Sequence, residues 1–242
     1  MRVTTCFLLL SGAAAALLAG GCADGIARGK AEREIAKMLP EILGPAESYS
    51  VKVDGKATEM LKGKVRGVQV TGVRVQPEGL PCLDRLEADV RDVVVDTKNH
   101  AILSAGKTAW SGWLDNAEIT RLLNGRIPLL EEIQVSVLQG YVVASGKATY
   151  LGVTTSGSVR ARPSVRKGSE IWMTPTRFEF LKLGTGVPAW AGQKVADIVN
   201  PVYTVPTAKY GISLTGIAAE KDRLRLDGDM DLIRMSETRR KR

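Results

Sequence analysis

Residues able to carry out acid–base or metal chemistry are few in this sequence. His100 is the only histidine, which excludes paired-histidine catalysis and multi-histidine metal sites and predicts a solvent-facing turn residue. Cys82, in the segment GLPCLDRL, has no histidine near it in the sequence, so a structural thiol is favoured over a nucleophile. No phosphate-binding G-x-x-x-x-G-K-S/T pattern occurs. We therefore expect no enzyme activity, no metal and no cofactor, and we interpret two acidic pairs as solvated turn charges: Glu131 with Glu132, and Asp227 with Asp229.

The first 21 residues have the features of a secretion signal. A basic residue precedes an apolar segment that is short for a membrane span, and small residues lead to Cys22. The ending LLAGGC resembles a bacterial lipobox, in which Cys22 would be acylated, although Ala19 stands where that motif usually has leucine. Ordinary cleavage near Ala23, or retention of the leader as an anchor, are the alternatives. We expect a lipoprotein signal peptide over 1–21, a short tether over 22–25, and an extracytoplasmic protein anchored to a membrane through its lipid, in the periplasm or cell envelope.

The positive charge of the chain is concentrated at its ends. Arg2 and the terminal run 239–242 together carry five of the positive charges, and without them the formal charge of +8 falls to +3. A mildly basic body does not favour nucleic acid as a partner. Residues 235–242 are expected to form a basic disordered tail.

A segment of helical periodicity follows the leader. Between residues 26 and 43 apolar positions recur at steps of three and four, and charged residues fill most of the others, which is typical of an amphipathic helix. Pro40 lies within the apolar stripe and has no backbone N–H, so a kink or a restart is expected there. Most of the chain after this helix has the alternation of strands. The stripe therefore predicts a helix packed on the inner face of a sheet that curls around it, with an apolar space between the two.

Several strands follow, and their alternation contains shifts. Residues 48–54 and 64–70 alternate apolar and polar side chains. Gly72 is expected to shift the apolar phase to Val73 and Val75, as a β-bulge would. Alternation over 150–165 would span about 50 Å, which requires a long, twisted antiparallel meander. Further strands are predicted over 86–91, 133–138, 141–148, 170–183, 210–219 and 223–232, with tight turns at 139–140 and 167–168.

Two short helices are expected between strands. Asp115 or Asn116 can cap a helix that closes at 124–125. A second helix should begin at Pro188 and end at 200–201.

Four residues are candidates for contact with a membrane surface or a lipid head group. Trp110 and Trp113 lie in a Gly/Ser segment interpreted as a loop, and indole rings favour the boundary between water and lipid. Arg160 and Arg162 gather at one strand end, where they could meet a lipid phosphate. Core packing of the tryptophans and a solvated arginine surface are the simpler interpretations.

The order of these elements resembles the LmeA-type periplasmic phospholipid-binding family. The likeness runs from Ala27 to Leu232 through AEREIAKMLPEILG, VKVDGKATEMLKGKVRGVQVTGVRV, EITRLLNG, IVNPVYTVP and YGISLTGIAAEKDRLRLDG. One departure is Ala57, where relatives often carry proline. The resemblance implies a fold similar to the tubular lipid-binding proteins, in which a bent antiparallel sheet wraps a long helix around acyl chains, and it transfers no catalytic motif.

These arguments give one hypothesis and one alternative. The hypothesis is an α+β protein with a single elongated domain over 26–234, which binds phospholipid or another acyl lipid in an apolar cavity for lipid transfer or envelope lipid homeostasis. The alternative is an envelope assembly or scaffold lipoprotein with a solid core, and the volume beneath the helix separates the two. A hydrolase acting on envelope lipids lacks any triad. The predicted cavity wall consists of Ile35, Met38, Leu39, Ile42, Val195, Ile198 and Val199.

Overall fold

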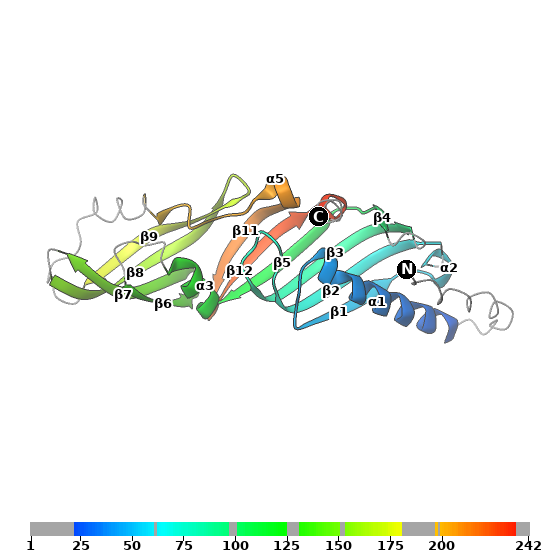
Figure 1. The fold of residues 1–242 in the computed structure, drawn as a ribbon, viewed down its shortest axis with the longest axis horizontal. Helices are drawn as coiled ribbons and strands as arrows, with labels where there is room; N and C mark the ends of the chain where they lie inside the picture. Colours follow the sequence, from blue (N-terminus) through cyan, green and yellow to red (C-terminus); the bar gives the residue numbers. More distant parts are fainter. Residues whose placement is uncertain are drawn as a thin grey trace, which may run out of the picture.

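The chain forms an elongated α+β molecule in which two antiparallel sheets follow one another along the long axis (Figure 1). The computed structural model describes residues 22–60, 62–96, 101–124, 131–150, 153–180, 197 and 199–235. Helix α1 lies beside the strands at one end, and the smaller sheet occupies the other end. The fold class predicted from the sequence is confirmed.

The larger sheet curls strongly, into a half-barrel. Its seven strands follow the order β1-β2-β3-β5-β12-β11, and β4 pairs with β3. The strands are β1 (Ser48–Asp54), β2 (Lys64–Val75), β3 (Leu83–Asp96), β4 (Ala101–Ser104), β5 (Thr108–Asp115), β11 (Ile212–Glu220) and β12 (Arg223–Met230).

The smaller sheet has five strands in the order β10-β9-β8-β7-β6. Its strands are β6 (Glu131–Leu138), β7 (Tyr141–Tyr150), β8 (Val153–Arg166), β9 (Glu170–Phe180) and β10 (Tyr203–Thr204). The long strand and the turns predicted at 139–140 and 167–168 are confirmed. The helices in the described part of the chain include α1 (Cys22–Ile42), α2 (Ala57–Met60), α3 (Asn116–Leu123) and α5 (Thr207–Tyr210).

Two residues with positive φ bend the larger sheet. Gly72 was expected to shift the phase of β2, but it faces inward in phase with Val70, and Val73 is 39% exposed. The shift occurs at Arg74, whose φ of +49° turns Val75 back into the core. A further shift occurs in β3 at Asp92, where φ is +50°. Such irregularities increase local twist and curl a sheet.

The strands divide into two sheets because α3 occupies the free edge of β6. The N–H of Val135 donates to Oγ1 of Thr120 (3.1 Å), and the N–H of Val137 donates to Oδ1 of Asn116 (3.0 Å). Asp115 caps α3 by accepting from the N–H of Glu118 (2.7 Å), as predicted. The edge of β6 is thus bonded to a helix at these positions, and the predicted antiparallel meander is confirmed within the smaller sheet, through β6, β7, β8 and β9.

Strand β11 joins the two sheets end to end. The N–H of Gly140, in the β6–β7 turn, donates to the carbonyl of Ala219 (2.9 Å), and the N–H of Leu214 donates to the carbonyl of Gly168 (2.8 Å). At the β11–β12 turn, the N–H of Asp222 donates to the carbonyl of Val137 (3.0 Å). Backbone hydrogen bonds at both ends of β11 therefore fix the smaller sheet against the larger one.

The ends of the predicted domain need correction. Residues 22–25, expected to be a short tether, are the first turn of α1. Pro40 lies in the last turn, and the helix ends two residues later without a restart. Met235, expected to begin the disordered tail, is 7% exposed and belongs to the core, and its N–H donates to the carbonyl of Asp231 (3.0 Å). The remainder of that tail, 236–242, lies outside the described residues, as does the leader, 1–21.

Candidate functional site

An apolar cavity lies between α1 and the inner face of the larger sheet. Its volume is about 90 Å³, and every residue that lines it is apolar. The helix contributes Ile35, Met38, Leu39 and Ile42, which are the four residues predicted from its periodicity. Leu43 also lines the cavity. The opposite wall consists of Val65, Val68, Val70, Ala88, Val90, Val93, Val95, Ile102, Met230 and Leu232. Hydrocarbon can enter such a space without leaving a polar side chain unpaired.

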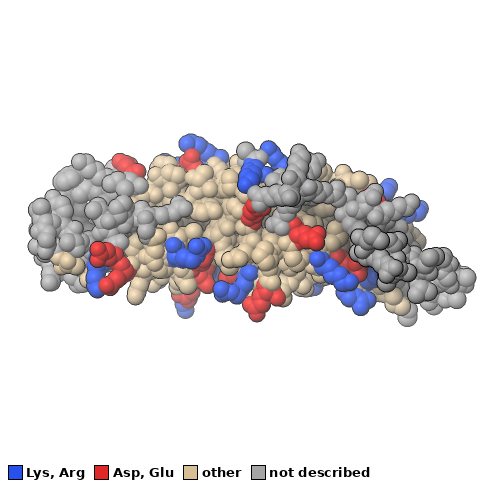
Figure 2. Space-filling model, in the orientation of Figure 1, with Lys and Arg blue, Asp and Glu red and all other residues tan. Residues whose placement is uncertain are grey.

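Helix α1 closes the cavity from the open edge of the sheet. It packs on the edge strand β1 and on α2. Oε1 of Glu32 accepts a hydrogen bond from the outward-pointing N–H of Val53 (3.1 Å), which fixes the helix to that edge. Leu39 is 5% exposed, whereas Ile35 and Met38 are only half-buried. In Figure 2 charged side chains lie mainly toward the upper and lower margins of the face shown, and other residues dominate its middle.

The volume of the cavity limits the size of the ligand that it can hold. Sites for small molecules usually measure about 300–1,000 Å³, and this cavity is well below that range. A phospholipid chain therefore fits only if α1 moves away from the sheet. The helix is suited to such a movement because it contacts the edge of the half-barrel and faces the opposite wall across the cavity.

The later helix contributes less than predicted to the described site. Val195 and Ile198 lie outside the described residues. Val199 is helical and packs against the core, but it is not among the residues that line the cavity. Sequence reasoning did not assign the wall formed by β3, β4 and Met230. Alternation marked such residues as buried, but only the strand register brings them opposite α1.

Trp110 and Trp113 lie on strand β5, where a loop was predicted. Trp110 is 3% exposed, and its indole N–H donates to the carbonyl of Asp229 (3.3 Å), which fits core packing. Trp113 is half-buried on the outer face of the sheet. Its indole N–H donates to Glu220 (3.3 Å), and the guanidinium groups of Arg85 and Arg223 lie over its ring.

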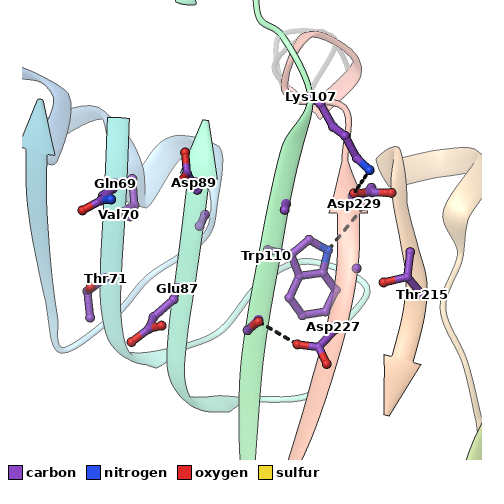
Figure 3. A pocket seen from close by; sticks show the side chains of 14 residues that line it. Gln69, Val70, Thr71, Glu87, Asp89, Lys107, Trp110, Thr215, Asp227 and Asp229 are labelled. Carbon is purple, nitrogen blue, oxygen red and sulfur yellow. Dashed lines mark hydrogen bonds and ion pairs between the residues drawn. The ribbon is translucent and has the colours of Figure 1, made fainter. Parts of the chain in front are cut away.

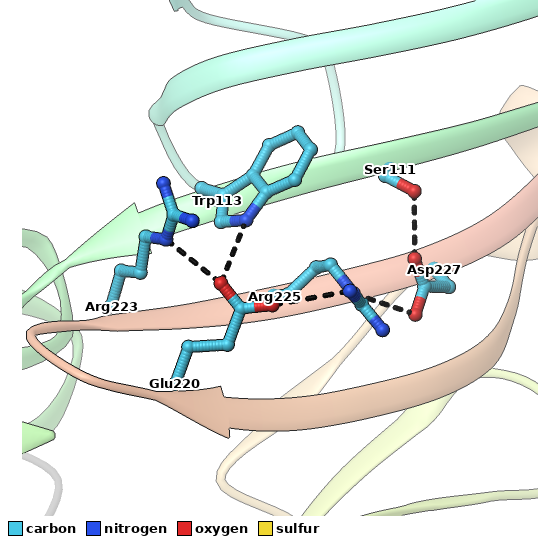
Figure 4. A network of polar contacts seen from close by, with 6 residues as sticks. All are labelled: Ser111, Trp113, Glu220, Arg223, Arg225 and Asp227. Atoms are coloured by element: carbon cyan, nitrogen blue, oxygen red, sulfur yellow. Dashed lines mark hydrogen bonds and ion pairs between the residues drawn. The ribbon is translucent and has the colours of Figure 1, made fainter. Parts of the chain in front are cut away.

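A polar trough crosses the outer face of the larger sheet, on the side opposite to α1. Its volume is about 690 Å³, and its lining includes Gln69, Glu87 and Asp227 (Figure 3). Lys107 pairs with Asp229 (3.6 Å) at one side of it. At the other side, the network of Figure 4 joins Ser111 to Asp227 (2.7 Å) and Asp227 to Arg225 (3.1 Å). The acidic side chains of the trough are thus ion-paired: Asp229 with Lys107 in the lining, and Asp227, Glu87 and Asp89 with arginines outside it.

Glu118 joins α3 to the start of β3. Its carboxylate accepts hydrogen bonds from the N–H of Cys82 (3.0 Å) and from the guanidinium of Arg121 (2.7 Å). Burial acts to raise the pKa of Glu118, but the hydrogen bonds and the charge of Arg121 outweigh it and hold the pKa below its ordinary value. Burial raises the pKa of the Cys82 thiol, so Cys82 stays protonated at neutral pH.

We expect Glu118→Gln to lower the free energy of unfolding by about 1 kcal/mol near pH 7. The fold favours the ionised carboxylate, because its pKa is lower in the folded chain than in the unfolded chain. This contribution is present above the unfolded value of about 4.3 and is lost as the pH falls through the lower folded value. Urea unfolding near pH 7 and near pH 3 should therefore show the two proteins converging at low pH, with the exposed Glu59→Gln as a control. Equal destabilisation at both pH values would contradict this role.

The described residues contain no cluster of histidine, cysteine or acidic side chains suited to hold a metal ion. Among the helices in this part of the chain, none combines the length and the apolar character of a membrane span.

Comparison with known proteins identifies the family. The family model described as LmeA-like phospholipid-binding matches residues 22–229. Neither the curated proteins nor the solved structures gave a match. The matched range includes α1, both sheets except the last residue of β12, and the cavity lining except Met230 and Leu232. The family is described by the binding of phospholipid and is not a known enzyme family. The chain therefore belongs to the LmeA-like phospholipid-binding family.

Proposed function

We propose that this protein is an extracytoplasmic lipoprotein that binds the acyl chains of phospholipid in the cavity beneath α1, for lipid transfer or lipid homeostasis in the cell envelope. The observation that carries the proposal is the entirely apolar lining of that cavity, with four of its residues on one face of α1. Family membership supplies phospholipid as the class of ligand.

The energetics favour a reversible carrier. Burial of one CH₂ group contributes about 0.8 kcal/mol, so an acyl chain of about 15 such groups gains roughly 12 kcal/mol in an apolar cavity. It loses about the same amount on leaving the bilayer, and the transfer is close to neutral. The head group remains at the protein surface, because burial of its charge would cost several kcal/mol.

The proposed anchor lies close to the proposed site. Cys22 is the first residue of α1, and Ile35 is the first residue of that helix to line the cavity. A rise of about 1.5 Å per residue places the cavity roughly 20 Å from the acylated cysteine along the helix axis. The mature protein would thus hold its cavity near the membrane surface.

Co-purified lipid tests the proposal. The mature chain, residues 22–242, is purified and extracted for mass spectrometry, and its uptake of a labelled phospholipid from vesicles is measured. We expect bound phospholipid, saturable uptake, and faster hydrogen exchange at the N–H of Val53 on loading, because movement of α1 releases that group from Glu32. Absence of both extracted lipid and uptake would refute lipid binding.

The scaffold alternative is favoured by one observation, the small volume of the cavity. It predicts that the interior stays packed and that exchange at Val53 is unchanged by vesicles. The same measurements therefore separate the two functions.

A further inference from the structure

Three arginines along β8 have no carboxylate partner among the residues that the structure describes. Arg160, Arg162 and Arg166 alternate with the buried Ala161 and point to the outer face of the smaller sheet. Within the described part of the chain, no acidic side chain lies at ion-pair distance from any of the three. Six other arginines are ion-paired in the same part of the chain: Arg85, Arg91, Arg121, Arg177, Arg223 and Arg225.

Aromatic rings hold these guanidinium groups in place. Arg160 and Arg162 lie over the ring of Tyr141, at 5.4 Å and 5.1 Å from its centroid, and Nη2 of Arg162 donates to the Tyr141 hydroxyl (2.8 Å). Arg166 lies 4.0 Å from the ring centroid of Trp172. A guanidinium stacked on a ring keeps N–H donors at its edge available for an anion.

One neighbouring acidic group, Glu170, offsets part of this positive charge at the Arg166 end of the strand. Glu170, the register partner of Arg166, accepts from Lys167 (3.0 Å) and from the Trp172 indole N–H (2.9 Å). The pKa of Tyr141 is lowered, first by the hydrogen bond from Arg162 and then by the nearby positive charges. The surface around Tyr141, Arg160 and Arg162 therefore carries a positive field.

An exposed leucine lies in the same surface. Leu138 is the register partner of Tyr141 and is 43% exposed. Leucine, tyrosine, tryptophan and arginine together are typical of surfaces that meet the boundary between water and lipid. We call this surface the arginine face and define it by Leu138, Tyr141, Arg160, Arg162, Arg166 and Trp172.

We propose that the arginine face docks the protein on an anionic phospholipid membrane, with the guanidinium groups on lipid phosphates and Leu138 among the upper acyl segments. The proposal adds a second membrane contact to the lipid-binding cavity, and it does not depend on that cavity. An acidic protein partner would complement the arginines but would give no reason for the exposed leucine. The mild net charge of the body makes a polynucleotide a poorer fit.

Vesicle co-sedimentation of residues 22–242 carrying Cys22→Ser, which cannot be acylated, tests the proposal. Vesicles of phosphatidylglycerol and phosphatidylcholine are compared with vesicles of phosphatidylcholine alone at about 0.1 M salt. We expect binding to the anionic vesicles and little to the neutral ones. The double variant R160Q/R162Q should bind at least about tenfold more weakly, and Leu138→Glu should also weaken binding.

The control removes the same charge elsewhere. Lys64 and Arg66 are exposed on β2, and K64Q/R66Q should bind nearly as well as the unmodified protein. Equal losses of vesicle binding in the two double variants, or no loss in R160Q/R162Q, would overturn the proposal. Binding of a single-stranded oligonucleotide without binding of vesicles would also overturn it. R160Q/R162Q should keep its extractable lipid, and variants of the cavity should keep vesicle binding. Failure of the membrane-docking proposal is therefore distinguishable from failure of the proposed lipid binding in the cavity.

Discussion

Met38→Glu is expected to reduce the equilibrium uptake of labelled phospholipid at least about 100-fold. Met38 lines the apolar cavity from α1 and is half-buried. A carboxylate there would face the acyl chain, and its desolvation costs several kcal/mol, which corresponds to two or more powers of ten in affinity. Titration with a labelled lipid measures the effect. Partial recovery at low pH is expected, because protonation removes the charge.

The control for this variant places the same side chain at an exposed position of α1. Lys30 is exposed, so Lys30→Glu should leave uptake within about twofold, since surface substitutions rarely change the free energy by more than about 0.5 kcal/mol. Ile35→Glu repeats the test one turn earlier in α1. A folding defect caused only by the substitution at Met38 would then not decide the result. Normal uptake by both cavity variants, with normal thermal unfolding, would remove α1 from the site.

Gly228→Ala is expected to destabilise the larger sheet by about 3 kcal/mol, at the upper end of the usual cost of overpacking. Gly228 lies beneath the indole of Trp110, its register partner on β5. An added Cβ would stand 2.6 Å from Nε1 of Trp110 and would overlap the carbonyl oxygen of Ser213. The carbonyl belongs to strand β11 and cannot rotate away, so the strands must separate. Urea unfolding followed by circular dichroism measures the loss.

Gly67→Ala provides the matched comparison in β2. Its added Cβ would meet its nearest neighbours at 3.7 Å and 3.9 Å, which is ordinary contact. We expect a change within about 0.5 kcal/mol. Similar losses in the two variants would mean that glycine is needed for a reason other than the indole above Gly228.

The sequence predicted features that depend on neighbours along the chain. Periodicity alone marked Ile35, Met38, Leu39 and Ile42 as one helix face, and the structure places all four on the cavity. The cap at Asp115 also follows from a local hydrogen bond. These features depend on the geometry of a single turn or helix, which one sequence specifies well.

Features set by distant partners were not predictable in the same way. Gly72 remains in phase because the ring of Tyr49 covers it, and the backbone of Arg74 produces the shift instead. The segment around Trp110 has the glycine and serine of a loop, yet strands β3 and β12 on either side make it a strand. Tyr141 and Trp172 come together with the arginines only through strand register.

Helix side chains bond to strand N–H groups at two sheet edges. Glu32 does so at Val53 of β1, and Asn116 and Thr120 do so on β6. Unsatisfied edge groups recruit strands from other molecules and start ordered fibres, most rapidly where copies are crowded together on a surface. By bonding to these groups, α1 and α3 oppose strand-to-strand growth at these two edges, which would keep copies of the proposed membrane-anchored protein separate where they are crowded on a bilayer.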